Sequence, residues 1–77
     1  MPKLAGFSGK DVIRILRKSF GFNFVSQKGS HIKLRKLTDG KTITVIVPDH
    51  KELAQGTLKN ILRQAQIQAE EFLNLTS

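Results

Sequence analysis

The sequence predicts a small α+β domain in which one helix precedes a three-stranded antiparallel sheet and a second helix follows it. Three observations predict this class. Two segments, one toward each end of the chain, repeat apolar residues at helical spacing. Three short runs between them alternate apolar and polar residues, as half-buried strands do. The dipeptides Gly-Ser and Asp-Gly separate these runs and predict two tight hairpins.

The composition limits both the size and the class of the protein. We expect the 77 residues to form one domain, residues 1–77. Hydrophobic residues make up 39% of the chain and charged residues 25%, a composition typical of a globular protein. The absence of cysteine excludes a disulfide framework and a thiolate metal site. No apolar run approaches the roughly 20 residues of a membrane helix. We therefore expect a cytoplasmic protein with no cofactor or metal and no membrane partner, and the net charge of +7 favours nucleic acid as partner.

The first helix is predicted to begin with Ser8 as its cap and to end near Phe20, because Gly21 follows. Asp11 adds a carboxylate to the first turn. The apolar stripe consists of Val12, Ile13, Ile15, Leu16 and Phe20. The other side of the helix carries Lys10, Arg14, Arg17 and Lys18. Residues 1–7 are expected to form a loose leader.

The three strands are predicted over Phe22–Lys28, His31–Thr38 and Lys41–Val47. Gly29-Ser30 fits a type II′ turn, Asp39-Gly40 fits a type I′ turn, and Pro48 ends the third strand. The predicted pairs are Gln27 with Ile32, Val25 with Leu34, Leu34 with Val45, and Ile32 with Val47. The face that we expect to be the core carries Val25, Ile32, Leu34, Ile43, Val45 and Val47. The opposite face carries Phe24, Ser26, Lys28, His31, Lys33, Arg35, Leu37, Thr42, Thr44 and Ile46.

The last helix is predicted to start at Gly56, with Thr57 as its cap, after a loop over residues 48–55. Its apolar stripe is Leu58, Ile61, Leu62, Ala65, Ala69, Phe72 and Leu73. The pattern leaves open whether this helix runs unbroken to Asn74 or kinks near Gln66. Both helices can bury their stripes only on the one apolar face of the sheet, which makes a two-layer domain.

The candidate site is the tight turn between the first two strands. Lys28 and His31 lie directly opposite each other across this turn, with their side chains on the same face. An imidazole titrates near neutral pH and is suited to act as a general base. Lys28, Lys33 and Arg35, with Ser30 of the turn, are candidates to bind a phosphate and stabilise charge on it. RNA carries its own nucleophile, the 2′-hydroxyl, so this chemistry requires no metal.

Plainer interpretations stand beside this one. A polar sheet face is ordinarily a solvated face, and a histidine at a turn is ordinarily a polar turn residue. Three large apolar groups on the open face, Phe24, Leu37 and Ile46, favour a contact surface for a base or for a protein. His50 lies in the loop that leaves the sheet beside His31 and is a candidate second acid/base group. Packing of His50 on the last helix is an equal alternative.

Several short motifs occur in a fixed order along the chain. The first half carries Ser8-Gly9-Lys10-Asp11-Val12-Ile13, Gly21-Phe22 and Gln27-Lys28-Gly29-Ser30-His31. The second half carries Val47-Pro48-Asp49-His50, Glu52-Leu53, Gly56-Thr57-Leu58 and Ile61-Leu62-Arg63-Gln64-Ala65. Together, and over nearly the whole chain, they resemble the HicA family of toxin–antitoxin RNases.

The resemblance implies a fold similar to the double-stranded-RNA-binding domain. It implies the toxin of a type II system, an mRNA interferase that cleaves mRNA without the ribosome, and a HicB-like antitoxin that covers the active site. The family's catalytic histidine falls on His31, and its second histidine falls on His50. The chain departs from the family on the strand after the turn, where the family often has an aromatic residue and this sequence has Leu34 or Arg35, and again after Ala65. Where the family usually has a helix-breaking glycine after Ala65, this sequence has Gln66.

Two other functions compete with an endoribonuclease. A non-catalytic RNA-binding module of the same fold would read the shape of A-form RNA, which requires no Gly-Ser-His turn, so the turn favours the enzyme. A protein-interaction domain would use Phe24, Leu37 and Ile46 as its central apolar patch.

Overall fold

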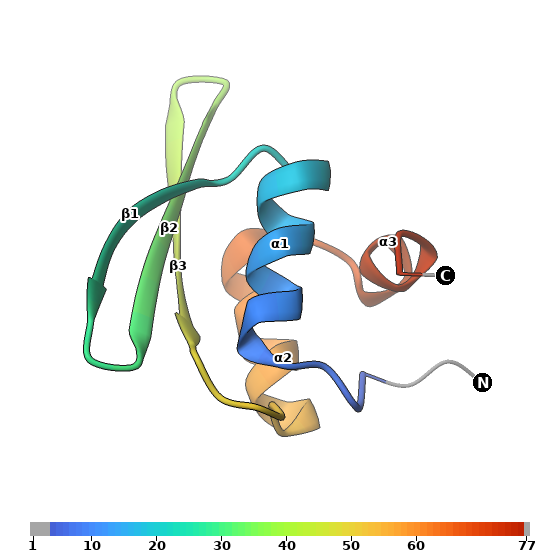
Figure 1. Cartoon of the computed structure of the whole chain (residues 1–77). Helices are drawn as coiled ribbons and strands as arrows, with labels where there is room; N and C mark the ends of the chain where they lie inside the picture. The colour runs from blue at the N-terminus through green and yellow to red at the C-terminus, as the bar shows by residue number, and fades with distance from the viewer. Residues whose placement is uncertain (1–3, 77) are drawn as a thin grey trace.

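The sheet and its two covering helices follow one another along the chain as predicted. The computed structural model describes residues 4–76. The elements are α1 (Gly9–Ser19), β1 (Asn23–Lys28), β2 (His31–Thr38), β3 (Lys41–Pro48), α2 (Gln55–Ala65) and α3 (Ala69–Asn74). The strands form one antiparallel sheet in the order β1-β2-β3. Figure 1 shows α1 and α2 on one face of this sheet, with α3 on the side of that helical layer away from the sheet. The predicted α+β class is confirmed.

The start of α1 is determined by its own first residues. The Asp11 N–H donates to Ser8 Oγ at 3.0 Å, and the Ser8 N–H donates to Asp11 Oδ2 at 3.1 Å, which is a capping box. The next residue, Gly9, donates its N–H to the carbonyl oxygen of His50 at 2.8 Å. A Cβ at Gly9 would collide with the carbonyl oxygen of Pro48. The N-terminus of α1 therefore packs directly on the chain that leaves β3.

The hairpin of β2 and β3 has the predicted register along its whole length. Asp39 and Gly40 have φ values of 49° and 74°, and a type I′ turn requires positive φ at both positions. Two predicted pairs are confirmed: Leu34 with Val45 and Ile32 with Val47. The side chains that face the helices are buried: Ile32, Leu34, Ile43, Val45 and Val47. These five form the sheet side of the core.

Strand β1 departs from the prediction because it contains a β-bulge. The register passes from Ser26 opposite Lys33 to Phe24 opposite Leu34, which leaves Val25 as the extra residue. The predicted pairing of Val25 with Leu34 and the burial of Val25 are therefore wrong, and Val25 is 38% exposed. Directly opposed residues share a face of the sheet. Phe24 consequently lies on the helix side with Leu34, and its predicted place on the open face is also wrong.

Two strand boundaries shift by one residue. Phe22, predicted as the first residue of a strand, precedes β1 and is buried in the core. The ring of Phe22 also makes a cation–π contact, because Lys36 Nζ lies 5.8 Å from the ring centroid. The third strand was predicted to end at Val47, but Pro48 is the last residue of β3.

The segment before α1 is packed, so the expected loose leader is wrong for its described part. Leu4 is buried in the core. The ring of Phe7 meets the ring of Phe72 in α3 edge-on, with 5.3 Å between centroids. The Leu53 N–H donates to the carbonyl oxygen of Phe7 at 2.8 Å. Residues 1–3 of the predicted leader lie outside the described residues.

The C-terminal helix is broken in two. Gln66 adopts the left-handed conformation, with φ 60° and ψ 40°, so it occupies a helix-ending position that usually favours glycine. This answers the question that the sequence left open. The start of α2 was predicted wrongly: its N-cap is Ala54, which makes no side-chain capping bond, and Thr57 lies inside the helix. In α3, Phe72 is buried as predicted, whereas Ala69 is exposed.

Candidate active site

The uncovered face of the sheet carries the predicted histidine and lysines. Lys28 lies opposite His31 across the β1–β2 turn, and Lys33 lies opposite Ser26. Gly29 has φ 60°, as the first turn position of a type II′ turn requires. An open hollow of about 520 Å³ on this face is lined by Ser26, Lys28, His31, Lys33 and Ile46. We call it the histidine hollow.

Not every predicted site residue lines the histidine hollow. Lys28, His31 and Lys33 do so. Ser30 lies in the turn itself, where its carbonyl oxygen accepts the N–H of Asp49 at 2.6 Å. Arg35 lies further along β2, opposite Thr44. Both are exposed and lie beside the hollow, not in its lining.

Two lining residues were not among the predicted catalytic or phosphate-binding residues, although Ile46 was expected to belong to an apolar contact surface. Ser26 and Ile46 both lie opposite Lys33, one on β1 and the other on β3. The predicted register placed both on this face. Because both residues pair with Lys33 on the central strand, the predicted register was sufficient to place them beside the predicted site residues.

The chemistry of the histidine hollow follows from its side chains. It brings together one imidazole, two ammonium groups and one hydroxyl, with Ile46 as an apolar neighbour. Within residues 4–76, no carboxylate lies within 4.0 Å of either lysine, so their charges are available to a ligand. Lysine ammonium groups bind phosphate oxygens, and an imidazole both accepts and donates protons near neutral pH. This arrangement suits a phosphodiester.

His50 lies near the same edge of the sheet but lines a different hollow. The pairing of His31 with Pro48, from which the nearness of His50 was predicted, is confirmed. The hollow of His50 is lined by Ser8, Lys10, Asp49, His50 and Lys51. The two histidines thus belong to separate hollows. No group of three or more potential metal ligands occurs in the described part of the chain.

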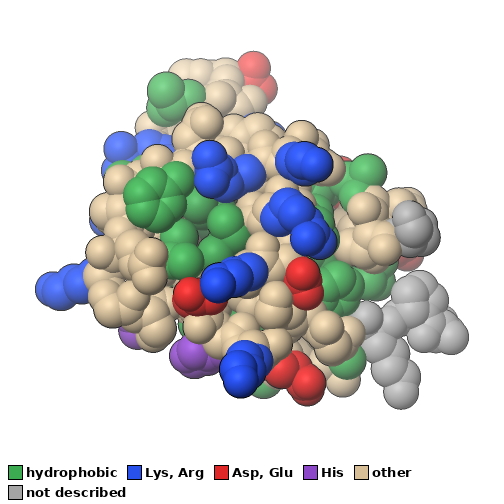
Figure 2. All heavy atoms as spheres, in the orientation of Figure 1, with side chains coloured by type: hydrophobic (Ala, Val, Ile, Leu, Met, Phe, Trp, Pro, Cys, Tyr) green, Lys and Arg blue, Asp and Glu red, His purple; other side chains and the backbone are tan. Residues whose placement is uncertain are grey.

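A third hollow lies on the other face of β1, between that strand and α1. Its apolar lining residues are Ile13, Phe22, Phe24 and Ile32, and its basic ones are Lys10, Arg14, Arg17 and Lys18. Figure 2 shows Lys and Arg side chains gathered over α1 around a recessed apolar area. The sequence indicated the basic side of the helix. It did not indicate the hollow, because the bulge that turns Phe24 toward α1 was not predicted.

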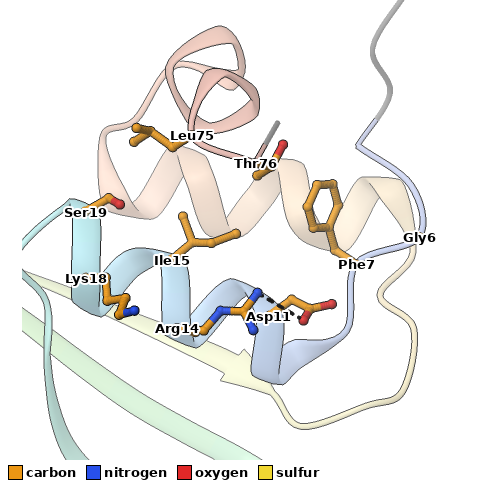
Figure 3. Close-up of a pocket in the computed structure, with 9 residues that line it drawn as sticks. All are labelled: Gly6, Phe7, Asp11, Arg14, Ile15, Lys18, Ser19, Leu75 and Thr76. Carbon is orange, nitrogen blue, oxygen red and sulfur yellow. Dashed lines mark ion pairs between the residues drawn. The ribbon is translucent and has the colours of Figure 1, made fainter.

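A fourth hollow, shown in Figure 3, separates α1 from the C-terminal segment. Within it, Arg14 Nη2 pairs with Asp11 Oδ1 at 3.5 Å. The hydrogen bonds from the backbone and the side chain of Ser8 hold the pKa of Asp11 below its ordinary value, and the charge of Arg14 acts in the same direction. Asp11 therefore belongs to the cap of α1, and none of the predicted site residues lines this hollow.

These observations define a small basic α+β domain whose open sheet face carries a histidine among cations. The sequence model of the family described as HicA toxin of bacterial toxin–antitoxin matches residues 9–67 of the 77-residue chain. The chain belongs to the HicA toxin family, which confirms the resemblance and implies a cognate antitoxin. No curated protein and no solved structure matched the chain. No helix among residues 4–76 is long and apolar enough to cross a membrane.

Proposed function

We propose that this toxin is a metal-independent endoribonuclease that cleaves mRNA and thereby arrests translation. In this proposal it acts in the cytoplasm as part of a type II system, with a HicB-like protein as antitoxin. The observation that carries the proposal is the histidine hollow, in which His31 is grouped with Lys28 and Lys33. General-base and cation chemistry of this kind suffices for RNA because the substrate supplies the 2′-hydroxyl nucleophile.

Each side chain has a proposed role in one transesterification step. His31 takes the proton of the 2′-hydroxyl, and the 2′-oxygen bonds to the adjacent phosphorus while the bond to the 5′-oxygen breaks. Lys28 and Lys33 stabilise the negative charge on the phosphorane-like transition state. Ser30 and Arg35 bind the neighbouring RNA backbone. The 5′-oxygen takes up a proton as it leaves, from solvent or from His50 as a second acid/base group.

The test is cleavage of a labelled RNA by the wild type and by His31→Ala. Loss of one general base typically costs about 10²–10⁴-fold in rate, so His31→Ala should lose cleavage while keeping its fold and its affinity for RNA. The products should carry a 2′,3′-cyclic phosphate and a 5′-hydroxyl, and EDTA should not change the rate. A wild type that binds RNA and never cuts it would favour the RNA-binding module instead.

His50→Ala is the companion test, because it removes the other histidine of the chain. A loss as large as that of His31→Ala would identify an acid/base pair of two histidines. A rate near that of the wild type would assign His50 to the packing of the loop on α1. Full activity of a folded His31→Ala protein would contradict the mechanism itself.

The antitoxin is proposed to cover the same face. It would present acidic groups to Lys28, Lys33 and Arg35 and apolar groups to Ile46 and Leu37, which are 37% and 76% exposed. Expression of the toxin alone should stop growth, and co-expression with the antitoxin should restore it. A complex that leaves His31 open to solvent would contradict inhibition by occlusion.

A further inference from the structure

We propose that the hollow between α1 and β1 is a second subsite for the RNA, which binds one unpaired nucleobase and the phosphates beside it. We call it the α1–β1 subsite, with the lining Lys10, Ile13, Arg14, Arg17, Lys18, Phe22, Asn23, Phe24 and Ile32. The inference rests on the proposed function and adds that the substrate is single-stranded along this stretch.

The apolar floor of the subsite is accessible mainly at one aromatic ring. Phe22 and Ile32 are 2% and 8% exposed, whereas Phe24 is 49% exposed. The hollow measures about 570 Å³, within the range of about 300–1,000 Å³ that is usual for ligand sites. Aromatic side chains bind unpaired bases by stacking, whatever the base, because every base has a π-face. Phe24 is therefore the group against which a base would rest.

The basic rim has the spacing of one side of a helix. Lys10, Arg14 and Arg17 are separated by four and three residues, so they lie in a row about 10 Å long at 1.5 Å per residue. Arg14 pairs with Asp11 at 3.5 Å. Among residues 4–76, no carboxylate lies within 4.0 Å of Lys10, Arg17 or Lys18. A row of cations beside an exposed aromatic ring is the combination with which proteins bind single-stranded nucleic acid.

The subsite and the histidine hollow meet at the edge of the sheet. β1 is an outer strand, and the bulge at Val25 lies between Ser26, which lines the histidine hollow, and Phe24, which lines the subsite. An RNA strand bound at His31 therefore reaches the subsite by passing around this edge. A double helix bends smoothly only over tens of base pairs, so it cannot follow that path. The geometry selects an unpaired strand.

The first experiment measures binding without cleavage. The probe is a fluorescent, fully 2′-O-methylated oligonucleotide of about 12 nucleotides, which lacks the nucleophilic hydroxyl. Phe24→Ala should weaken its binding by about 5- to 150-fold, the range for loss of one base–aromatic stack. Arg17→Gln should make the negative slope of log K against log salt shallower by about 0.7, as expected when one phosphate contact of a single strand is lost.

Each variant has a matched control elsewhere on the surface. Leu75 is 49% exposed, as Phe24 is, and lies at the end of α3. Arg63 is an exposed arginine in the last turn of α2. Leu75→Ala and Arg63→Gln should leave the affinity within about twofold of the wild type and the salt slope unchanged. Circular dichroism checks that all four variants are folded.

An oligonucleotide of the same length without bases separates stacking from charge. The wild type should bind it more weakly than the complete oligonucleotide, whereas Phe24→Ala should bind both with equal affinity. Arg17→Gln should weaken the binding of both. If Phe24→Ala weakened the binding of the base-free oligonucleotide as much as that of the complete one, the Phe24 ring would not contact a base.

The outcomes distinguish this inference from the proposed function. If folded Phe24→Ala and Arg17→Gln proteins bind the probe as the wild type does but still cut RNA, the subsite is wrong and the nuclease stands. If binding depends on Phe24 but unmodified RNA is never cut, the subsite stands and the nuclease is wrong. If both variants lose only their affinity for the antitoxin, the hollow is a protein interface and the subsite is wrong.

Discussion

The two outer strands flank the same central strand but are held in place in different ways. β3 buries Ile43, Val45 and Val47 beneath the helices. β1 buries none of its six residues and is joined to the sheet by its ladder with β2, interrupted at Val25. β3 therefore belongs to the core, and β1 is an edge with an accessible surface on both sides.

This difference explains where the candidate binding surfaces lie. The side chains on the buried face of a strand cannot contact a ligand, and a shift by one residue would move that apolar set into solvent. A strand with no buried side chains carries no such penalty, so a bulge can turn side chains two residues apart, which normally share a face, to opposite faces. In this protein, Ser26 and Lys28 line the histidine hollow from β1, and Phe24 lines the α1–β1 subsite from the same strand.

The largest expected effect compares one valine on each outer strand. Val45 is fully buried, and Val25 is 38% exposed. Val45→Ala should lower the free energy of unfolding by about 2 kcal/mol, because it removes buried methyl groups and leaves a cavity. Val25→Ala should change it by less than about 0.5 kcal/mol. Urea denaturation of both variants measures the difference, and equal losses would mean that Val25 belongs to the core after all.

Hydrogen exchange of the backbone amides tests the same contrast without any mutation. Amides of β1 that bond to β2 should exchange at least about tenfold faster than those that join β2 to β3, because opening β1 exposes no buried side chain of that strand. The measurement is native-state exchange followed by NMR. Uniform protection of both ladders would show that the sheet opens only as a unit.

The cap of α1 should stabilise β3 more than β1, because Gly9 bonds to His50 and packs on Pro48 at the end of β3. Ser8→Ala should lower the free energy of unfolding by about 1 kcal/mol, the usual effect of removing an N-cap side chain. Exchange should accelerate at the end of β3 and not in β1. Faster exchange in β1, with unchanged exchange at the end of β3, would contradict the role of the cap in stabilising β3.

The pH dependence provides the control for this cap. The pKa of Asp11 is lowered on folding, so its contribution to stability is complete above its ordinary value of 3.8 and is lost as the pH falls through the lower folded value. The wild type should therefore lose more stability than Asp11→Asn as the pH falls below about 4. Parallel pH profiles of the two proteins would contradict a stabilising role of the carboxylate.

The smallest expected effect is at the end of α2, the helix that packs on β3. Gln66 has φ 60°, and a left-handed conformation costs a residue with a side chain about 1–2 kcal/mol. Gln66→Gly relieves that cost but adds freedom to the unfolded chain, so it should stabilise the protein by about 0.5 kcal/mol. Thermal unfolding measures the gain, and a loss of stability would show that the Gln66 side chain makes a contact worth more than the strain.

The features that the sequence alone determined are local or set by a turn. The cap of α1 depends on two residues three apart, Ser8 and Asp11, and the turn residues Asp39 and Gly40 set the register of β2 with β3. The placement of Lys28 opposite His31 was predicted correctly because only the two turn residues, Gly29 and Ser30, separate them. In each case the partners are close along the chain, so their residue types are sufficient.

Only the tertiary structure decided the features that depend on distant contacts or on a strand without burial. The bulge at Val25 left no mark on the sequence, because no buried face requires strict alternation in β1. Phe7 is ordered by Phe72, which lies at the other end of the chain. His50 is held in a separate hollow because the backbone around it bonds to the start of α1 and to the β1–β2 turn. Such contacts are specified by packing between segments far apart in sequence, and no local pattern of residues encodes them.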